Sequence, residues 1–227
     1  MLVENMVQEV VPMMDRMHVL IIGPGLGRCP LVMRAVAEIM QQAIDKNLAM
    51  VVDADALYML TLAPYKDIFS TYEKVIWTPN VVEAKRLLAQ SSASENDDDD
   101  ENWKFRTKGI VIQKGHRDVI MSAPSSSPQG PGTTIICQQA GGMKRSGGLG
   151  DVLAGILGTF MAWNGILSSR DNKQMTDTTD RVLSCWTACC ICKEATKRAF
   201  DKKKRSMTAP DVLEELGPAI NDMTSEG

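Results

Sequence analysis

The sequence predicts an α/β fold in which helices cover both faces of a mainly parallel sheet. Three observations lead to this prediction. Short apolar, β-branched runs recur along the chain, as in strands that are buried on both faces. Stretches with helical spacing separate these runs, and Gly, Asp or Asn follows several of them. With 227 residues, of which 44% are hydrophobic, the chain is long enough for one substantial core, so we expect a single domain over residues 1–227.

The first half of the chain alternates helices and strands. An amphipathic helix is expected within residues 1–17, ending near Pro12. The strands expected in this half are residues 18–22, 49–52 and 75–77. The helices expected between and after them are residues 31–47, a short helix after Asp53, and residues 81–88. Because ligands bind at the carboxyl ends of parallel strands, the polar residues after each strand are candidates for a site.

The second half completes the sheet and ends in helices. Residues 109–113 predict a strand, and the extended segment 119–121 predicts an antiparallel hairpin with it. A last short strand is expected at residues 135–137. The helices expected after it are residues 152–163, the cysteine-bearing segment 180–192, and a final helix capped by Thr208 or Asp211.

Charge and composition exclude several classes of function. A net charge of −3 and a pI near 5.5 give no general attraction to nucleic acid or to anionic membranes. No apolar run reaches the ~18 residues of a membrane span, so we expect no membrane partner. The acidic insert at residues 91–102 is expected to be a solvated loop, because like charges at that density cannot pack. Cysteines on one helix cannot surround zinc tetrahedrally, so the cluster within 185–192 predicts buried, reduced thiols.

A glycine-rich segment at residues 141–150 is the strongest functional feature. It leads into Asp151 and the helical pattern that follows, so it places a flexible loop at a helix N-terminus. The free N–H groups and partial positive charge there attract phosphate. Asp151 has two interpretations, as the N-cap of the helix or as a functional carboxylate at the anion site. Capping alone does not explain the glycines, and the sequence therefore favours phosphate binding.

Three other carboxylates follow strands, and two of them have more than one interpretation. Asp53 and Asp55 come directly after an expected strand, where they could hold a hydrated metal or polar substrate groups. Asp53 could equally cap the short helix behind it. Glu83 lies three residues after Asn80, where it could complete a capping box or face bound phosphates through Mg²⁺.

Five motifs in order resemble those of the ATP-dependent NAD(P)H-hydrate dehydratases, a branch of the ribokinase-like superfamily. The motifs are residues 23–28, 53–57, 78–83, 114–118 and 141–151. The resemblance implies a three-layer α-β-α ribokinase-like fold. Family members normally begin with further strands and helices, so the chain is expected to be N-terminally truncated relative to them.

The resemblance also implies roles for individual residues. Asp151 would be the catalytic carboxylate and would contact the substrate. The other residues implied for substrate binding are Gly25, Asn80, Val81, Val82, Glu83, Ala84, Lys85 and Arg86. The residues implied for ATP binding are Lys114, Gly115, His116, Arg117, Asp118, Gly141, Gly142, Met143, Lys144, Arg145, Ser146, Gly147, Gly148, Leu149 and Gly150.

The implied activity is ATP-dependent dehydration of the S-epimer of NADHX or NADPHX to NAD(P)H, with release of ADP and phosphate. ATP would be the co-substrate and Mg²⁺ its companion ion, with Glu83 as one candidate for contact through water or phosphate. An NAD(P)HX epimerase would act alongside the protein, and the resemblance allows a homo-oligomer. The expected location is cytoplasmic, with mitochondria or another organelle as the alternative. Two other functions stay open: a ribokinase-like kinase for a thiazole or pyrimidine alcohol, and a non-catalytic truncated paralogue.

Overall fold

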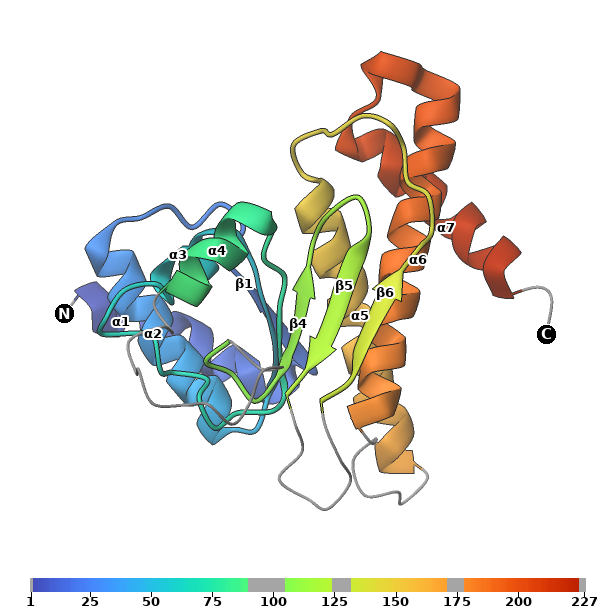
Figure 1. Cartoon of the computed structure of the whole chain (residues 1–227). Coiled ribbons are helices and arrows are strands. Elements are labelled where there is room, and N and C mark those ends of the chain that lie inside the picture. The colour runs from blue at the N-terminus through green and yellow to red at the C-terminus, as the bar shows by residue number, and fades with distance from the viewer. Residues whose placement is uncertain (1, 90–104, 124–131, 171–177, 225–227) are drawn as a thin grey trace.

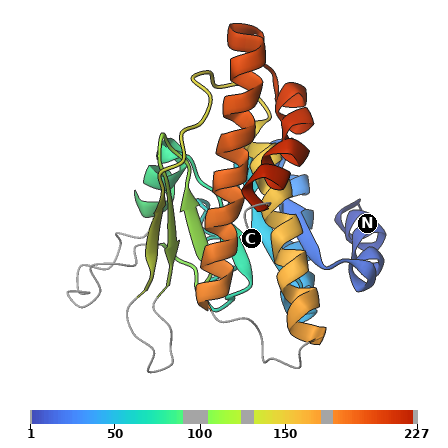
Figure 2. The same cartoon turned by 90° about the vertical axis from the view of Figure 1, so that its right-hand side faces the viewer.

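The computed structural model describes residues 2–89, 105–123, 132–170 and 178–224. Within them, one sheet lies between two layers of helices (Figures 1 and 2). This arrangement confirms the predicted three-layer α/β fold. The acidic insert at residues 91–102 lies outside the described residues, as does most of the predicted surface loop at residues 122–132.

The sheet has six strands in the order β1-β2-β3-β4-β5-β6. Their bounds are Val19–Ile22 (β1), Ala49–Val52 (β2), Val75–Trp77 (β3), Ile110–Gln113 (β4), Asp118–Ser122 (β5) and Thr134–Cys137 (β6). The first four strands pair in parallel, whereas β5 pairs antiparallel with both β4 and β6. The predicted hairpin after β4 is therefore confirmed. Because β1 to β4 are parallel, the loops that follow them emerge at one edge of the sheet (Figure 1).

Helices from the two halves of the chain cover opposite faces of the sheet (Figure 1). The first layer contains α1 (Leu2–Val10), the 3₁₀ helix η1 (Val11–Arg16), α2 (Pro30–Asp45), α3 (Ala54–Met59) and α4 (Val81–Ala89). The second layer contains α5 (Leu149–Arg170), α6 (Thr178–Lys203), the 3₁₀ helix η2 (Lys204–Ser206) and α7 (Ala209–Thr224). The helices that precede β4 in the sequence therefore cover one face of the sheet, and the helices that follow β6 cover the other.

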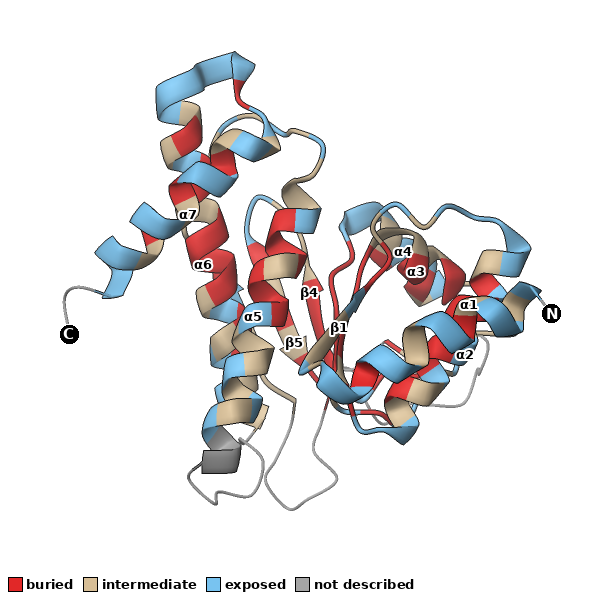
Figure 3. Ribbon diagram, turned by 180° about the vertical axis from the view of Figure 1, so that it is seen from behind, coloured by how far each residue is buried: buried red, intermediate tan, exposed pale blue. Residues whose placement is uncertain are grey.

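Two hydrophobic cores meet at the sheet because neighbouring side chains of a strand point to opposite faces. On β2, Met50 and Val52 pack with the first helical layer, and Val51 packs with the second. On β3, Val75 and Trp77 likewise belong to one core and Ile76 to the other. Figure 3 shows buried residues on strands of the sheet and on the inward faces of the helices. Burial of both faces explains the continuous apolar runs in the sequence.

Helix α5 is the element that joins the sheet to the glycine-rich segment. It packs against β1 and β2, and Gly158 allows the close approach because a Cβ there would lie 2.8 Å from Ile21 Cδ1. Residues 149–167 are long and apolar enough on average to cross a membrane, which corrects the expectation that no segment reaches that length. The sequence obscures this because polar residues such as Asp151 and Asn164 interrupt the run. A third of this stretch is buried, on the face that includes Ala154 and Leu157.

Helices α6 and α7 complete the second layer. The clustered cysteines of α6, residues 185, 189, 190 and 192, are buried and form no disulfides, as the sequence predicted. At the start of α7, the backbone N–H and the hydroxyl of Thr208 both donate to Asp211 Oδ2 at 2.8 Å. Thr208 and Asp211 therefore cap the helix together, which the sequence had left as alternatives.

Candidate active site

The loop after β1 packs tightly onto the end of β2. Gly23 has φ +129°, and a Cβ there would lie only 1.7 Å from the carbonyl oxygen of Asp53. No other residue fits at this position. The loop is also tied to α3, because Gly27 N–H donates to Asp55 Oδ2 at 3.0 Å and Arg28 Nε donates to Asp55 Oδ1 at 3.2 Å. Gly25 lies within this loop, in the left-handed region at φ +70°.

A buried ion pair lies at the centre of the carboxyl edge. Asp53 is 1% exposed, and its Oδ1 accepts from Lys114 Nζ at 2.7 Å and from Ala54 N–H at 2.8 Å. A Cβ on Gly150 would lie 3.2 Å from Asp53 Oδ2 and 3.3 Å from Lys114 Nζ. The pair therefore lies directly against the N-terminus of α5. Asp53 caps α3 and neutralises Lys114, so the capping interpretation is confirmed.

Asp151 lies in the first turn of α5. The helix begins at Leu149, and Val152 N–H donates to the carbonyl of Gly148 at 3.0 Å. Asp151 is therefore the third residue of the helix, and its interpretation as the N-cap is wrong. The difference arises because Gly150, although a poor helix former, is already helical. The side chain of Asp151 is exposed and has no hydrogen bond or ion pair with any residue that the structure describes.

The loop at residues 114–118 is held from three sides. Lys114 N–H donates to Pro79 O at 2.8 Å, and Gly115 N–H donates to Asp118 Oδ1 at 2.8 Å. Lys193 of α6 donates through Nζ to the carbonyls of Gly115 and His116 at 2.8 and 3.1 Å. The same ammonium lies 3.3 Å from the buried carboxylate of Asp118.

The glycine-rich loop is held by the same turn of α6. Gly142 N–H donates to Thr196 Oγ1 at 3.2 Å, and a Cβ on Gly142 would lie 2.4 Å from the carbonyl oxygen of Thr196. Further along, Lys144 Nζ donates to Met207 O at 2.6 Å. Lys193 and Thr196 thus fix both loops that the sequence assigned to ATP. Sequence reasoning missed this support, because no local pattern marks a helical Lys or Thr as a loop partner.

The remaining residues assigned to ATP lie along these two loops. Met143, Arg145 and Gly147 are exposed. Gly148 has φ +86°, and a Cβ there would lie 3.0 Å from Ala209 Cβ, so this glycine lets the loop pass close to α7. Gly141, Ser146, Leu149 and Arg117 complete the set.

The segment at residues 80–86 starts with a complete capping box. Asn80 Oδ1 accepts from the N–H groups of Val82 and Glu83 at 2.9 and 3.0 Å. Glu83 Oε2 in turn accepts from Asn80 N–H at 2.8 Å. Among the other residues assigned to the substrate, Val81, Val82, Lys85 and Arg86 are exposed, whereas the side chain of Ala84 is buried in the core.

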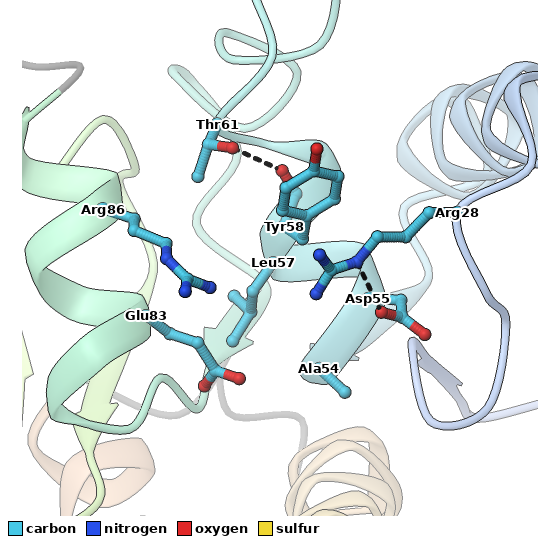
Figure 4. A pocket seen from close by; sticks show the side chains of 8 residues that line it. All are labelled: Arg28, Ala54, Asp55, Leu57, Tyr58, Thr61, Glu83 and Arg86. Atoms are coloured by element: carbon cyan, nitrogen blue, oxygen red, sulfur yellow. Dashed lines mark hydrogen bonds and ion pairs between the residues drawn. The ribbon is translucent and has the colours of Figure 1, made fainter.

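Two cavities flank the site. A polar pocket of about 100 Å³ lies between the β1–α2 loop, α3 and α4 (Figure 4). Its lining residues are Arg28, Ala54, Asp55, Leu57, Tyr58, Thr61, Glu83 and Arg86. A larger, mostly apolar groove of about 600 Å³ runs between α5 and α7, and Gly148 and Asp151 lie in its lining.

The described residues contain no group of three or more His, Cys, Asp or Glu side chains that could hold a metal ion. Asp53, Asp55 and Glu83 are each hydrogen-bonded within the protein, and Asp151 alone among these four carboxylates has no described partner. Such a donor set suits Mg²⁺ that keeps several waters and is held largely by substrate phosphates. It does not suit an ion held by protein side chains alone.

The chain resembles named enzymes over nearly its whole length. Residues 1–218 match the family model described as NAD(P)H-hydrate dehydratase. An Emericella nidulans protein named ATP-dependent (S)-NAD(P)H-hydrate dehydratase is 33% identical, and the match covers 98% of this chain and 69% of that protein. A Mus musculus protein with the same name is 32% identical, with coverage of 96% of this chain and 61% of that protein.

The fold also has a solved counterpart. A ribokinase-like superfamily protein from Enterococcus faecalis V583 superimposes with a TM-score of 0.63 at 20% identity, covering 97% of this chain and 68% of that one. This likeness confirms the predicted ribokinase-like fold. The family match and the 33% identity to a named relative together decide the family. The chain belongs to the NAD(P)H-hydrate dehydratase family.

Proposed function

We propose that this chain catalyses the ATP-dependent dehydration of the S-epimer of NADHX or NADPHX to NAD(P)H. The observation that carries the proposal is the position of Asp151. It is an exposed carboxylate without a described partner, in the first turn of α5, directly after the glycine-rich loop. Family membership supplies the reaction, and this geometry supplies a group that can receive the reacting hydroxyl.

ATP is proposed to bind where the two loops and the start of α5 meet. Backbone N–H groups of the glycine-rich loop and of the first helical turn would face the phosphates. Lys114 lies beside Gly150 and adds a positive charge, although Asp53 neutralises part of it. Lys193 and Thr196 keep both loops in position before the nucleotide arrives. Preorganised donors of this kind stabilise charge on a transferred phosphoryl group.

The proposed reaction has two steps. Asp151 accepts a hydrogen bond from the ring hydroxyl and orients its oxygen toward the γ-phosphorus. A new O–P bond forms, the bond between the β- and γ-phosphates breaks, and ADP and the hydroxyl proton leave. The ring C–O bond then breaks, phosphate departs with the electron pair, and a proton leaves the neighbouring ring carbon. The balance is NADHX plus ATP giving NADH, ADP, phosphate and a proton.

We also propose a role for Mg²⁺, a location in the cell and partners for this reaction. Mg²⁺ is proposed to enter with ATP, held mainly by phosphates, and it would neutralise charge on them. Contact between Glu83 and the ion is proposed through water or phosphate, because Glu83 Oε2 already accepts from Asn80 N–H. We place the protein in the cytoplasm, where an epimerase would convert the R-epimer of the hydrate into its substrate. A homo-oligomer is compatible with this role.

The test is the absorbance at 340 nm when purified protein meets NADHX, Mg²⁺ and ATP. We expect the absorbance to rise only with ATP, and ADP and phosphate to appear in equal amounts. Parallel reactions with ADP, without nucleotide and with NADPHX define the requirement. Folded protein that produces neither a rise nor ADP would contradict the proposal. A phosphorylated product without a rise at 340 nm would identify a kinase instead.

A further inference from the structure

We propose that Arg28 and Arg86 form a subsite for a phosphate group of the dinucleotide substrate. This inference rests on the proposed function and assigns a part of the substrate to the polar pocket in Figure 4. The two guanidinium groups reach the pocket from opposite walls and point toward each other across Leu57 (Figure 4). Guanidinium groups bind phosphate through paired N–H donors, and two such groups facing one space make it suitable for an anion.

Arg28 is held in a fixed orientation. Its guanidinium lies over the ring of Tyr58, 3.9 Å from the ring centroid, and its Nε donates to Asp55 Oδ1 at 3.2 Å. These contacts use one face of the group and its inner nitrogen. No hydrogen bond to a described residue uses the two terminal nitrogens, which point into the pocket in Figure 4. The arginine is therefore ordered before a ligand arrives, which lowers the entropy cost of binding.

Arg86 supplies the second positive charge. It lies in the last turn of α4, it is exposed, and its side chain has no hydrogen bond or ion pair with any residue that the structure describes. A cation without a partner that lines a pocket can exchange water for a phosphate oxygen without breaking a contact in the protein.

The two carboxylates that line the pocket are already engaged. Asp55 accepts from Gly27 N–H and from Arg28 Nε, and Glu83 accepts from Asn80 N–H. Glu83 does not form an ion pair with Arg86 within 4.0 Å. The formal charges of the two arginines and two carboxylates in the lining cancel, but the charged donors that remain free all belong to the arginines. An anion that bridges the two guanidinium groups is thus the ligand that the pocket accommodates.

The position of the pocket favours the dinucleotide over ATP. The lining comes from segments that follow β1, β2 and β3, the same segments that hold Gly25 and Asn80. The proposed ATP loops instead follow β4 and β6, and none of their residues lines the pocket. The dinucleotide offers two chemically equivalent sources of phosphate: the pyrophosphate of both substrates and the 2′-phosphate of NADPHX.

The experiment compares steady-state kinetics of the wild-type chain with Arg86→Gln and Arg86→Lys. We expect Arg86→Gln to raise KM for the dinucleotide about tenfold, as expected for loss of a charged hydrogen bond, and to change kcat and KM for ATP less than twofold. Arg86→Lys should fall between, because it keeps the charge and loses the planar donor pair. Arg34→Gln is the matched control, since Arg34 is exposed on α2 and does not line the pocket.

The two sources of phosphate predict different changes in KM for NADHX and NADPHX. A rise in KM for NADPHX alone assigns the pocket to the 2′-phosphate, and equal rises for NADHX and NADPHX assign it to the pyrophosphate. An unchanged KM for both dinucleotides, or a rise confined to ATP, overturns the proposal.

Calorimetric titration with NAD⁺ and NADP⁺ separates this inference from the proposed function. If the wild-type chain binds these dinucleotides but turns over neither hydrate, the proposed function fails. Weaker binding by Arg86→Gln would then still support the subsite. Equal binding by wild type, Arg86→Gln and Arg34→Gln, or no binding by wild type, overturns it.

Discussion

The two sides of the N-terminus of α5 differ in how completely this chain supplies their contacts. On one side, Asp53 and Lys114 form a buried ion pair against Gly150, and α6 fixes the adjoining loops. On the other side, the groove between α5 and α7 is walled by apolar side chains that remain open to solvent, such as Trp163 and Leu213. Asp151 lies between the two. The charged groups on the polar side are therefore paired within this chain. The apolar side has exposed surface available for a ligand or a further segment of protein.

The largest expected effect concerns Asp151, where the two sides meet. Asp151→Asn should lower kcat for NADHX about a thousandfold, because the amide is a far weaker acceptor for the hydroxyl proton. The free energy of unfolding should change by less than about 0.5 kcal/mol, since the side chain is exposed and has no described partner. Turnover at 340 nm and denaturant unfolding measure the two quantities. Full turnover by the variant would contradict the role of Asp151.

The second largest expected effect follows removal of the ion pair on the polar side of the α5 N-terminus. Lys114→Met should lower the free energy of unfolding by about 3 kcal/mol, because it leaves the carboxylate of Asp53 buried without its counter-charge. Adding Asp53→Asn should recover most of this loss, since the asparagine oxygen still accepts from Ala54 N–H without carrying a charge. Urea unfolding of both single variants and the double variant gives the coupling energy. Additive losses would mean that the pair contributes little to stability.

The next prediction concerns the pH dependence of stability, which depends on buried thiols of α6 and not directly on either side of the α5 N-terminus. Burial raises the pKa of the Cys185 and Cys192 thiols to about 12, and it raises the pKa of Cys189 well above its usual value near 9. Above pH 9 the unfolded chain releases these protons and the folded chain keeps them, so stability falls as pH rises toward 12. Each thiol should cost about 1 kcal/mol between pH 9 and pH 10.

Cys137 behaves in the opposite direction at lower pH. The Cys190 thiol lies 3.5 Å from it, and this hydrogen bond lowers the pKa of Cys137 to about 7. Its contribution to stability therefore rises between pH 7 and pH 9, which is why the fall is measured above pH 9. Unfolding of wild type and Cys185→Ala at pH 9 and pH 10 tests the assignment. An equal decrease in both proteins would show that Cys185 is not responsible.

The sequence predicted what depends on local chemistry. Every strand begins within one residue of its expected start, because short β-branched runs bounded by glycine or a polar cap have few alternatives. The capping box at Asn80 and Glu83 is likewise local. By contrast, Lys114 finds Asp53 across 61 positions, and Lys193 finds Gly115 across 78. Such partners depend on how the elements pack, and the spacing of residues in a single sequence does not reveal that packing.

The smallest expected effect on stability concerns the exposed side chains of the apolar groove between α5 and α7. Trp163→Gln and Leu213→Gln should each lower the free energy of unfolding by about 1 kcal/mol or less, because these side chains are 51% and 54% exposed. Leu157→Ala, on the buried face of α5, is the control and should cost about 3 kcal/mol. The two surface variants should nevertheless lower the fluorescence of a bound apolar dye, because they remove apolar surface from the groove. If they destabilise the chain as much as the control does, the groove is closed in solution and the contrast between the two sides is lost.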